Sequence, residues 1–147
     1  MIKMDHIGLV VKDFDKQLSF YRDVIGLKVT KDWVAVAPPG GSHTGMDSAR
    51  RRLAFLADDE GVLLELIYYI DPVSPVDAPI DHHHVGSAHL CFLTDNIEQR
   101  YEDLLQRGIK FLTPPKMTNS GNCLCYGQDP EGNWIELKEK MEDGTKK

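Results

Sequence analysis

Apolar residues along the chain alternate between the spacing of strands and the spacing of helices, and the same succession occurs twice. In each half a short apolar run is followed by a polar turn and then by apolar residues on one helical face. The two faces consist of Phe14, Leu18, Tyr21 and Ile25, and of Ile97, Tyr101, Leu104 and Leu105. The pattern predicts one amphipathic helix in each half, and these helices end at Gly26 and Gly108.

The residues before each predicted helix are typical of helix starts. Asp13 is placed to cap the first helix, and Gly26 can end it in the left-handed conformation. Asp95, with Glu98 three residues later, resembles a capping box at the start of the second helix. Both helices are therefore expected to have a side-chain cap.

Strand patterns surround both helices and complete the repeat. One strand precedes each helix and three follow it, the last of which contains the pattern Glu-Gly-x-x-x-Glu-Leu at 60–66 and again at 131–137. The intervening strands are expected at 27–36, 52–57, 109–112 and 122–127. Asp129-Pro130-Glu131-Gly132 indicates a turn before the final strand.

These elements predict two copies of a strand–helix–strand–strand–strand module within a single domain over 1–147. The copies extend over about 1–70 and 86–140. A linker at 71–85 with three prolines joins them, and a polar tail occupies 141–147.

Composition narrows the class of protein. With 147 residues, 41% hydrophobic and 27% charged, the chain suits about one globular domain. A net charge of −6 argues against a general binder of nucleic acid or anionic membrane. Three cysteines do not imply a disulfide framework, and no apolar run has the length of a membrane helix. The start shows no signal-peptide pattern, so a cytoplasmic protein is expected.

Matching histidines and glutamates stand out in the two copies. His6 and His89 lie on the first strands, and Glu65 and Glu136 lie in the apolar final strands. Taken singly, each is accounted for by a hydrogen-bonded histidine or by a strand with one wet face. Taken together, two imidazoles and two carboxylates converge if the copies pair about a pseudo-twofold axis, and they suit Zn, Ni, Co, Mn or Fe(II). The joint pattern favours one metal site.

Several segments resemble the vicinal oxygen chelate superfamily, which includes glyoxalase I, methylmalonyl-CoA epimerase, extradiol dioxygenases, fosfomycin-resistance proteins and bleomycin-binding proteins. The resemblance covers about residues 4 to 139. Its segments are Asp5-His6-Ile7-Gly8-Leu9-Val10-Val11, Phe20-Tyr21-Arg22-Asp23-Val24-Ile25-Gly26-Leu27, Leu64-Glu65-Leu66, His89, and Asp129-Pro130-Glu131-Gly132-Asn133-Trp134-Ile135-Glu136-Leu137.

The resemblance implies an α+β fold in which two βαβββ modules form a cupped, partly open mixed β-barrel with a metal in the cup. It implies one divalent ion (Zn, Ni, Co, Mn or Fe(II)) held by His6, Glu65, His89 and Glu136. It also implies a small-molecule substrate with vicinal oxygens. The modules pair either within one chain or across a homodimer, and we expect a homodimer.

Within that superfamily we expect a metal-dependent isomerase or lyase of the glyoxalase I or epimerase type. Such an enzyme abstracts a proton next to a carbonyl through a metal-stabilised enediolate. Glu136 is the first choice of catalytic base and Glu65 the second. The alternatives are an Fe(II) ring-cleaving dioxygenase and a non-catalytic, resistance-type binding protein.

The chain departs from both named enzymes at particular positions. Val10 stands where glyoxalase I enzymes usually have an arginine that helps to hold glutathione. Epimerases place an additional acidic base on the strand before Glu65, where this chain has Leu53, Ala54 and Phe55. The sequence therefore leaves the substrate open.

Arg52 and a run of three histidines each allow two interpretations. Arg52, at the end of an arginine run, is either a substrate-binding residue or part of a solvated strand start. The run His82-His83-His84 has the composition of a metal-binding tract, but its place in the linker favours a surface loop. Cys123 and Cys125 are expected to pack in the core.

Overall fold

The computed structural model describes residues 1–40, 43–76 and 80–140. The chain divides into two compact units, Met1–Asp77 and Ala78–Lys147, and each contains its own mixed sheet. This arrangement confirms the predicted α+β class. The predicted polar tail and the middle of the predicted linker lie outside the described residues.

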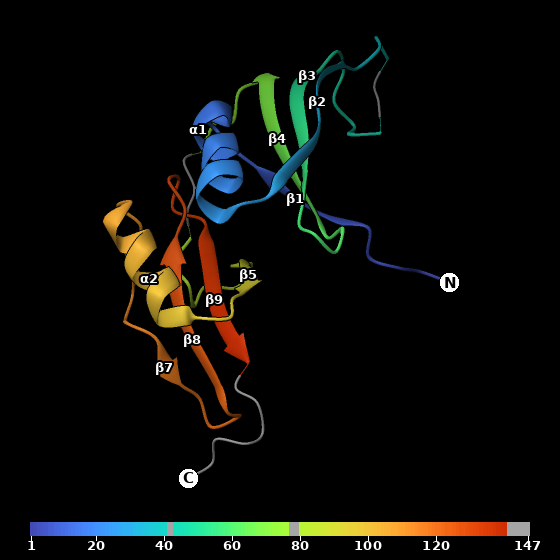
Figure 1. Cartoon of the computed structure of the whole chain (residues 1–147). Helices are drawn as coiled ribbons and strands as arrows, with labels where there is room; N and C mark the ends of the chain where they lie inside the picture. The colour runs from blue at the N-terminus through green and yellow to red at the C-terminus, as the bar shows by residue number, and fades with distance from the viewer. Residues whose placement is uncertain (41–42, 77–79, 141–147) are drawn as a thin grey trace. The chain divides into compact units, whose positions relative to one another are not determined.

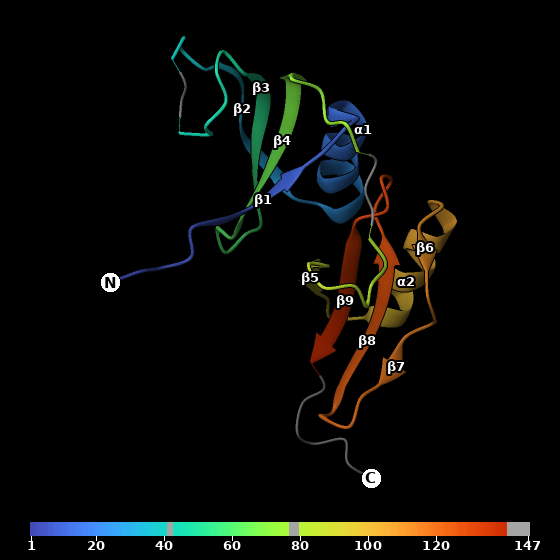
Figure 2. The same ribbon diagram turned by 180° about the vertical axis from the view of Figure 1, so that it is seen from behind.

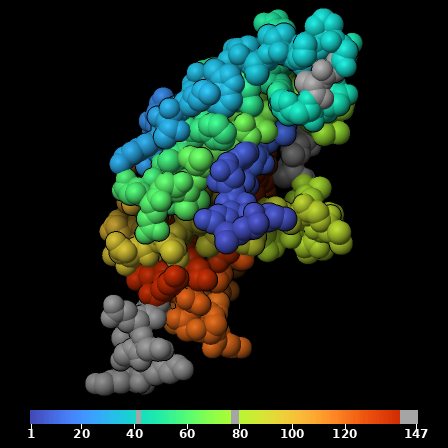
Figure 3. Space-filling model, turned by 90° about the vertical axis from the view of Figure 1, so that its right-hand side faces the viewer, coloured from blue at the N-terminus to red at the C-terminus, as the bar shows by residue number. Residues whose placement is uncertain are grey.

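The first unit has the predicted βαβββ order. Its elements are β1 (His6–Val10), α1 (Phe14–Ser19), η1 (Phe20–Ile25), β2 (Lys28–Val36), β3 (Arg50–Ala57) and β4 (Leu63–Asp71). The sheet order is β1-β4-β3-β2, with β1 parallel to β4 and the other pairs antiparallel (Figure 1). First and last strands of the unit are therefore neighbours. The five residues before β1 are exposed (Figure 3).

The first helix has the predicted ends but changes its winding halfway. Asp13 accepts a hydrogen bond from the Lys16 backbone N–H at 3.2 Å, and Gly26 adopts a φ of 99°. Between them, η1 is a π-helix, in which the Gly26 N–H donates to the Tyr21 carbonyl. The wider turn buries Phe20 as well as Tyr21, whereas the α-helical spacing had predicted only the tyrosine.

The second unit contains one more strand than predicted. Its elements are β5 (His89–Leu93), α2 (Ile97–Gln106), β6 (Lys110–Phe111), β7 (Lys116–Met117), β8 (Asn122–Gln128) and β9 (Trp134–Lys140). The sheet order is β5-β9-β8-β6, and β7 also pairs with β8 (Figure 2). Pro114 and Pro115 lie between β6 and β7. Proline has no N–H for a ladder, so the strand expected near 109–112 is short and a second begins after the prolines.

The predicted cap of α2 was wrong by one residue. Asn96, and not Asp95, caps the helix, because its side chain accepts from the Gln99 N–H at 3.0 Å. The Ile97 N–H donates to Glu139 Oε2 of β9 at 2.9 Å, which satisfies a second free N–H of the first turn. The helix end is thereby tied to the sheet.

The same turn precedes the last strand of each unit. Asp58 Oδ1 accepts from the N–H groups of Glu60 and Val62 at 3.0 and 2.8 Å. In the second unit Asp129 Oδ1 accepts from the N–H groups of Glu131 and Asn133, both at 2.9 Å. This Asx-type turn fixes the start of both β4 and β9. The predicted turn at 129–132 is confirmed.

Apolar side chains of each sheet and helix form the cores. The buried residues include Tyr21, Leu53, Leu56, Leu64 and Leu66 in the first unit and Ile97, Leu104, Ile135 and Leu137 in the second. None of the helices within the described ranges is both long and apolar enough to cross a membrane.

Candidate metal centre

Pairing of the first strand with the last brings His6 and Glu65 together in the first unit. Gly8 lies in register with Glu65. His6 is two residues before Gly8, so both residues face the same side of the sheet. The His6 Nε2 and Glu65 Oε2 atoms are 3.2 Å apart. A Cβ on Gly8 would lie 3.6 Å from Glu65 Oε2, so the glycine leaves space beside the carboxylate.

The second unit repeats this pair. Cys91 lies in register with Glu136, and the His89 Nε2 and Glu136 Oε2 atoms are 2.9 Å apart. In both pairs the carboxylate is better buried than the imidazole: side-chain exposures are 14% and 8% for Glu65 and Glu136 against 34% and 39% for the histidines. Each unit therefore presents one imidazole nitrogen and one carboxylate oxygen toward an accessible face.

The donor atoms of each pair fit a divalent metal ion. Ligand atoms about 2.0–2.2 Å from one ion, in neighbouring positions, lie about 3 Å from each other. The separations of 3.2 and 2.9 Å match this spacing. Nitrogen and carboxylate oxygen donors suit Zn, Ni, Co, Mn or Fe(II). The structure brings together His6 with Glu65 and His89 with Glu136, each pair inside its own unit.

Asp5 holds the imidazole of His6 from the other side. The His6 Nδ1–H donates to Asp5 Oδ2 at 2.8 Å, which directs Nε2 toward Glu65. The hydrogen bond to Asp5 raises the pKa of His6, and the Glu65 carboxylate adds to this effect. A carboxylate behind a histidine fixes the ring orientation and makes the other nitrogen a better ligand. Ala88 occupies the matching position before His89.

An aromatic side chain contacts each pair from the adjacent strand. Phe55 lies in register with Glu65, and its ring centroid is 5.4 Å from that of His6. Tyr126 lies in register with Glu136, with its centroid 5.2 Å from that of His89. The two positions are equivalent, and they differ in the tyrosine hydroxyl.

That hydroxyl makes the second pair a three-residue network. Tyr126 Oη donates to Glu136 Oε2 at 3.1 Å. Burial raises the pKa of Tyr126, and the hydrogen bond to Glu136 raises it further. The phenol therefore remains a neutral donor that orients the carboxylate. Both aromatic residues are ten positions before their glutamates, a repeat signal that the sequence prediction did not use.

The sequence prediction placed His82 in a surface loop with His83 and His84, and for His82 this was wrong. Its ring packs against Tyr126 and Trp134, with centroid distances of 4.4 and 5.1 Å, and lies 6.3 Å from the ring of His89. Among the described residues, its buried Nε2 has no hydrogen-bond partner. The indole N–H of Trp134 donates to the Ile80 carbonyl at 3.0 Å and holds this segment on β9. His83 and His84 are exposed, as expected for a surface loop.

Arg52 makes its contacts within the first unit. Its guanidinium donates to both carboxylate oxygens of Asp32, at 3.1 and 2.8 Å, and to Asp15 at 2.8 Å. It also lies over the ring of Phe14, 4.2 Å from the centroid. These contacts link β3 to β2 and α1. A substrate role for Arg52 stays a prediction.

The cysteines do not have the surroundings of reactive thiols. Cys123 and Cys125 are buried, and Cys91 is exposed. Burial raises the pKa of all three thiols, and it raises that of Cys125 to about 12. A thiol with a raised pKa is a poor nucleophile at neutral pH. The expected packing of Cys123 and Cys125 is confirmed.

Known proteins resemble this chain over most of its length. Residues 3–137 match the profile of the family described as the Glyoxalase/Bleomycin resistance protein/Dioxygenase superfamily. The chain is 30% identical to lactoylglutathione lyase of Schizosaccharomyces pombe over 98% of its length, and it spans about half (49%) of that enzyme. It is 26% identical to mouse mitochondrial methylmalonyl-CoA epimerase over 76% of this chain and 56% of the epimerase.

A solved structure supports the fold over nearly the whole chain. The crystal structure of a glyoxalase family protein from Bacillus cereus matches with a TM-score of 0.85. The match covers 96% of this chain and 95% of that protein at 23% sequence identity. At this identity the likeness shows the fold.

Proposed function

Because this chain belongs to the Glyoxalase/Bleomycin resistance protein/Dioxygenase superfamily, we propose that it is a metal-dependent isomerase or lyase. Its substrate would be a small molecule with two adjacent oxygen functions. One observation supports the proposal above others: each unit places a histidine and a glutamate within 3.2 Å of each other on neighbouring first and last strands. Chance does not account well for the same pair at the same register in both units.

His6, Glu65, His89 and Glu136 would together hold one divalent ion. When bound, such an ion polarises the vicinal oxygens of a substrate and stabilises the negative charge that develops on them. The two pairs supply two nitrogens and two oxygens, which is a complete four-ligand set. Asp5 would orient His6, as a carboxylate commonly does for a histidine ligand.

Glu136 is the proposed general base. Its carboxylate, released from the ion, would take the proton from the carbon next to the substrate carbonyl and return it to the neighbouring carbon on the same face. Return of a proton to the opposite face, as an epimerase requires, needs a second acid. Tyr126 and His89 both contact Oε2 of Glu136, which holds this carboxylate oxygen in place. Glu65, which faces Phe55 in place of a tyrosine, is the second candidate for this role.

We further propose that the two pairs combine across a twofold homodimer, so that each site takes one pair from each chain. Each unit contains one complete pair, as such an assembly requires. Diluting the protein below its dimer dissociation constant would then weaken metal binding. A monomer that keeps full metal affinity would contradict the shared site.

The first experiment is elemental analysis of tag-free protein, as isolated and after loading with Zn, Ni, Co, Mn or Fe(II). We expect about one ion per set of four ligands, and its loss in His6→Ala and Glu136→Ala. Hemithioacetals and 2-oxo thioesters are then screened for turnover. In Glu136→Gln we expect the fold to be retained and turnover lost.

The outcomes separate the classes of function. Unchanged turnover in Glu136→Gln together with lost turnover in Glu65→Gln would identify Glu65 as the general base instead of Glu136. Iron with oxygen-dependent turnover would indicate a ring-cleaving dioxygenase. Failure to bind any ion at these four residues would contradict the enzyme proposal and favour a ligand-binding relative.

A further inference from the structure

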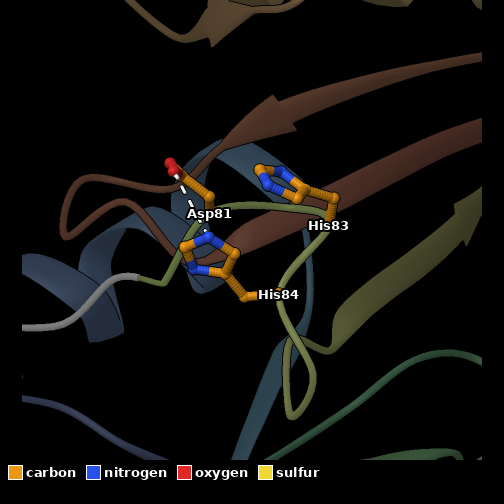
Figure 4. A group of neighbouring side chains, drawn as sticks. All are labelled: Asp81, His83 and His84. Atoms are coloured by element: carbon orange, nitrogen blue, oxygen red, sulfur yellow. Dashed lines mark ion pairs between the residues drawn. The ribbon is translucent and has the colours of Figure 1, made fainter.

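Three exposed side chains in the segment before β5 form a cluster of their own. One ligand atom each from Asp81, His83 and His84 lies within 4.8 Å of the other two (Figure 4). The Asp81 Oδ2 and His84 Nε2 atoms are 3.9 Å apart, and the His83 and His84 ring centroids are 4.5 Å apart. None of these residues belongs to the four proposed ligands of the active centre.

The backbone holds the cluster in a turn. The His84 N–H donates to the Asp81 carbonyl, and the Ser87 N–H donates to the His84 carbonyl, both at 3.0 Å. The first of these bonds joins the two ends of the turn, at Asp81 and His84. The three side chains are therefore brought together by local structure within one unit, and little chain entropy remains to be lost on binding.

Neighbouring residues attach this turn to the sheet. Trp134 Nε1 donates to the carbonyl of Ile80, the residue before Asp81. His82 packs its ring against Tyr126 and Trp134, while His83 and His84 are exposed. Of the three consecutive histidines, His82 therefore packs on the sheet, whereas His83 and His84 are exposed to solvent beside Asp81.

We propose that Asp81, His83 and His84 form a second binding site for a divalent transition-metal ion. Two imidazole nitrogens and one carboxylate oxygen suit Zn, Ni or Cu(II), whereas Mg and Ca prefer oxygen ligands alone. The donor atoms close from 4.8 Å to about 3 Å by rotation of exposed side chains. Water completes the coordination, because all three residues are exposed. The site is open and exchanges its ion with solvent.

The proposal is tested by counting Zn ions bound to the tag-free full chain by equilibrium dialysis, alongside calorimetric titration. The variants are His83→Ala/His84→Ala, His6→Ala/His89→Ala and, as a matched control, His43→Ala, which removes an exposed histidine from another loop. Wild type and His43→Ala are expected to bind about two Zn ions per chain, and His83→Ala/His84→Ala about one per chain. Far-ultraviolet circular dichroism checks that each variant is folded.

The comparison separates this site from the proposed active centre. If His6→Ala/His89→Ala keeps one ion that Asp81→Asn then weakens, the second site is supported. If wild type binds one ion and His83→Ala/His84→Ala binds none, the second site is supported and the proposed active centre is contradicted. Unchanged stoichiometry and affinity in His83→Ala/His84→Ala overturns the proposal. Cu(II) loading of His6→Ala/His89→Ala adds a spectroscopic test. In that variant, nitrogen hyperfine structure in the electron paramagnetic resonance spectrum is expected from His83 and His84 and should be lost on His83→Ala/His84→Ala.

Discussion

The Tyr126 hydroxyl donates a hydrogen bond to Glu136 Oε2 across 3.1 Å, and both residues lie in register on neighbouring strands. The equivalent register position in the first unit pairs Phe55 with Glu65. Two carboxylates with the same strand position and the same histidine neighbour thus differ in the hydrogen bonds that they accept. Glu136 accepts from Tyr126 and from the thiol of Cys91. Phe55 and Gly8, at the matching positions beside Glu65, have no side-chain donor. This difference gives the two glutamates distinct surroundings and suggests distinct roles.

Removing the hydroxyl tests this relationship directly. Tyr126→Phe is expected to lower the free energy of unfolding by about 1 kcal/mol, because a hydrogen bond to the buried carboxylate of Glu136 is lost. Turnover of a verified substrate is expected to fall through kcat, with KM little changed, since the carboxylate loses its orientation. Urea unfolding and steady-state kinetics measure the two effects. The matched variant Phe55→Tyr changes the other carboxylate. Equal kinetic effects of both variants would contradict separate roles for the glutamates.

Asp5 is expected to strengthen metal binding through His6. Asp5→Asn replaces the carboxylate that accepts from His6 Nδ1 with a neutral amide, and metal affinity should fall about tenfold. Competition with a chromophoric chelator measures the change. Ala88→Asp, at the matching position before His89, is the reciprocal variant and should raise affinity. An affinity that is unchanged in Asp5→Asn would show that His6 is oriented by something else.

Arg52 is expected to stabilise the first unit. Arg52→Met keeps the apolar stem over Phe14 but removes the bonds to Asp32 and Asp15, and it should cost about 1 kcal/mol of unfolding free energy. The nearby exposed Arg50→Met is the control and should stay within about 0.5 kcal/mol of wild type. A substrate-binding role would instead appear as a raised KM with unaltered stability.

The buried thiol of Cys125 predicts an alkaline loss of stability. Its pKa in the folded protein is raised to about 12, above the value near 9 that it has when exposed. The raised pKa stabilises the fold fully below pH 9, and this contribution is lost as the pH rises toward 12, because the unfolded chain releases the proton first. The difference in unfolding free energy between wild type and Cys125→Ala should therefore shrink by up to about 1.4 kcal/mol per pH unit above 9. Urea unfolding at pH values from 8 to about 11 measures this difference. Unfolding free energies that change with pH in the same way in both proteins would contradict the prediction.

Periodicity and repetition predicted much of the fold and of the proposed ligand set. The two modules follow from apolar spacing that occurs twice. The pairs of His6 with Glu65 and His89 with Glu136 follow from a duplicated motif, because parallel pairing of first and last strands brings the same positions together in both units.

The remaining features depend on tertiary packing or on competing local options. The π-helical turn is accompanied by burial of Phe20, which an α-helical wheel places away from the core. Asp95 and Asn96 are both good caps, and the geometry of the chain entering α2 selects the second. The position of His82 depends on the Trp134 hydrogen bond to a distant carbonyl, for which the sequence has no local signal.

The identical strand registers around Glu65 and Glu136 supply an internal reference for spectroscopy. In isotope-labelled protein, the two carboxylates experience the same temperature, ionic strength and solvent in one sample. The difference between their infrared stretching frequencies then reports mainly the Tyr126 hydroxyl and the neighbouring Cys91 or Gly8. The duplication thus allows the hydrogen bonds to Glu136 to be observed by comparing the protein with itself.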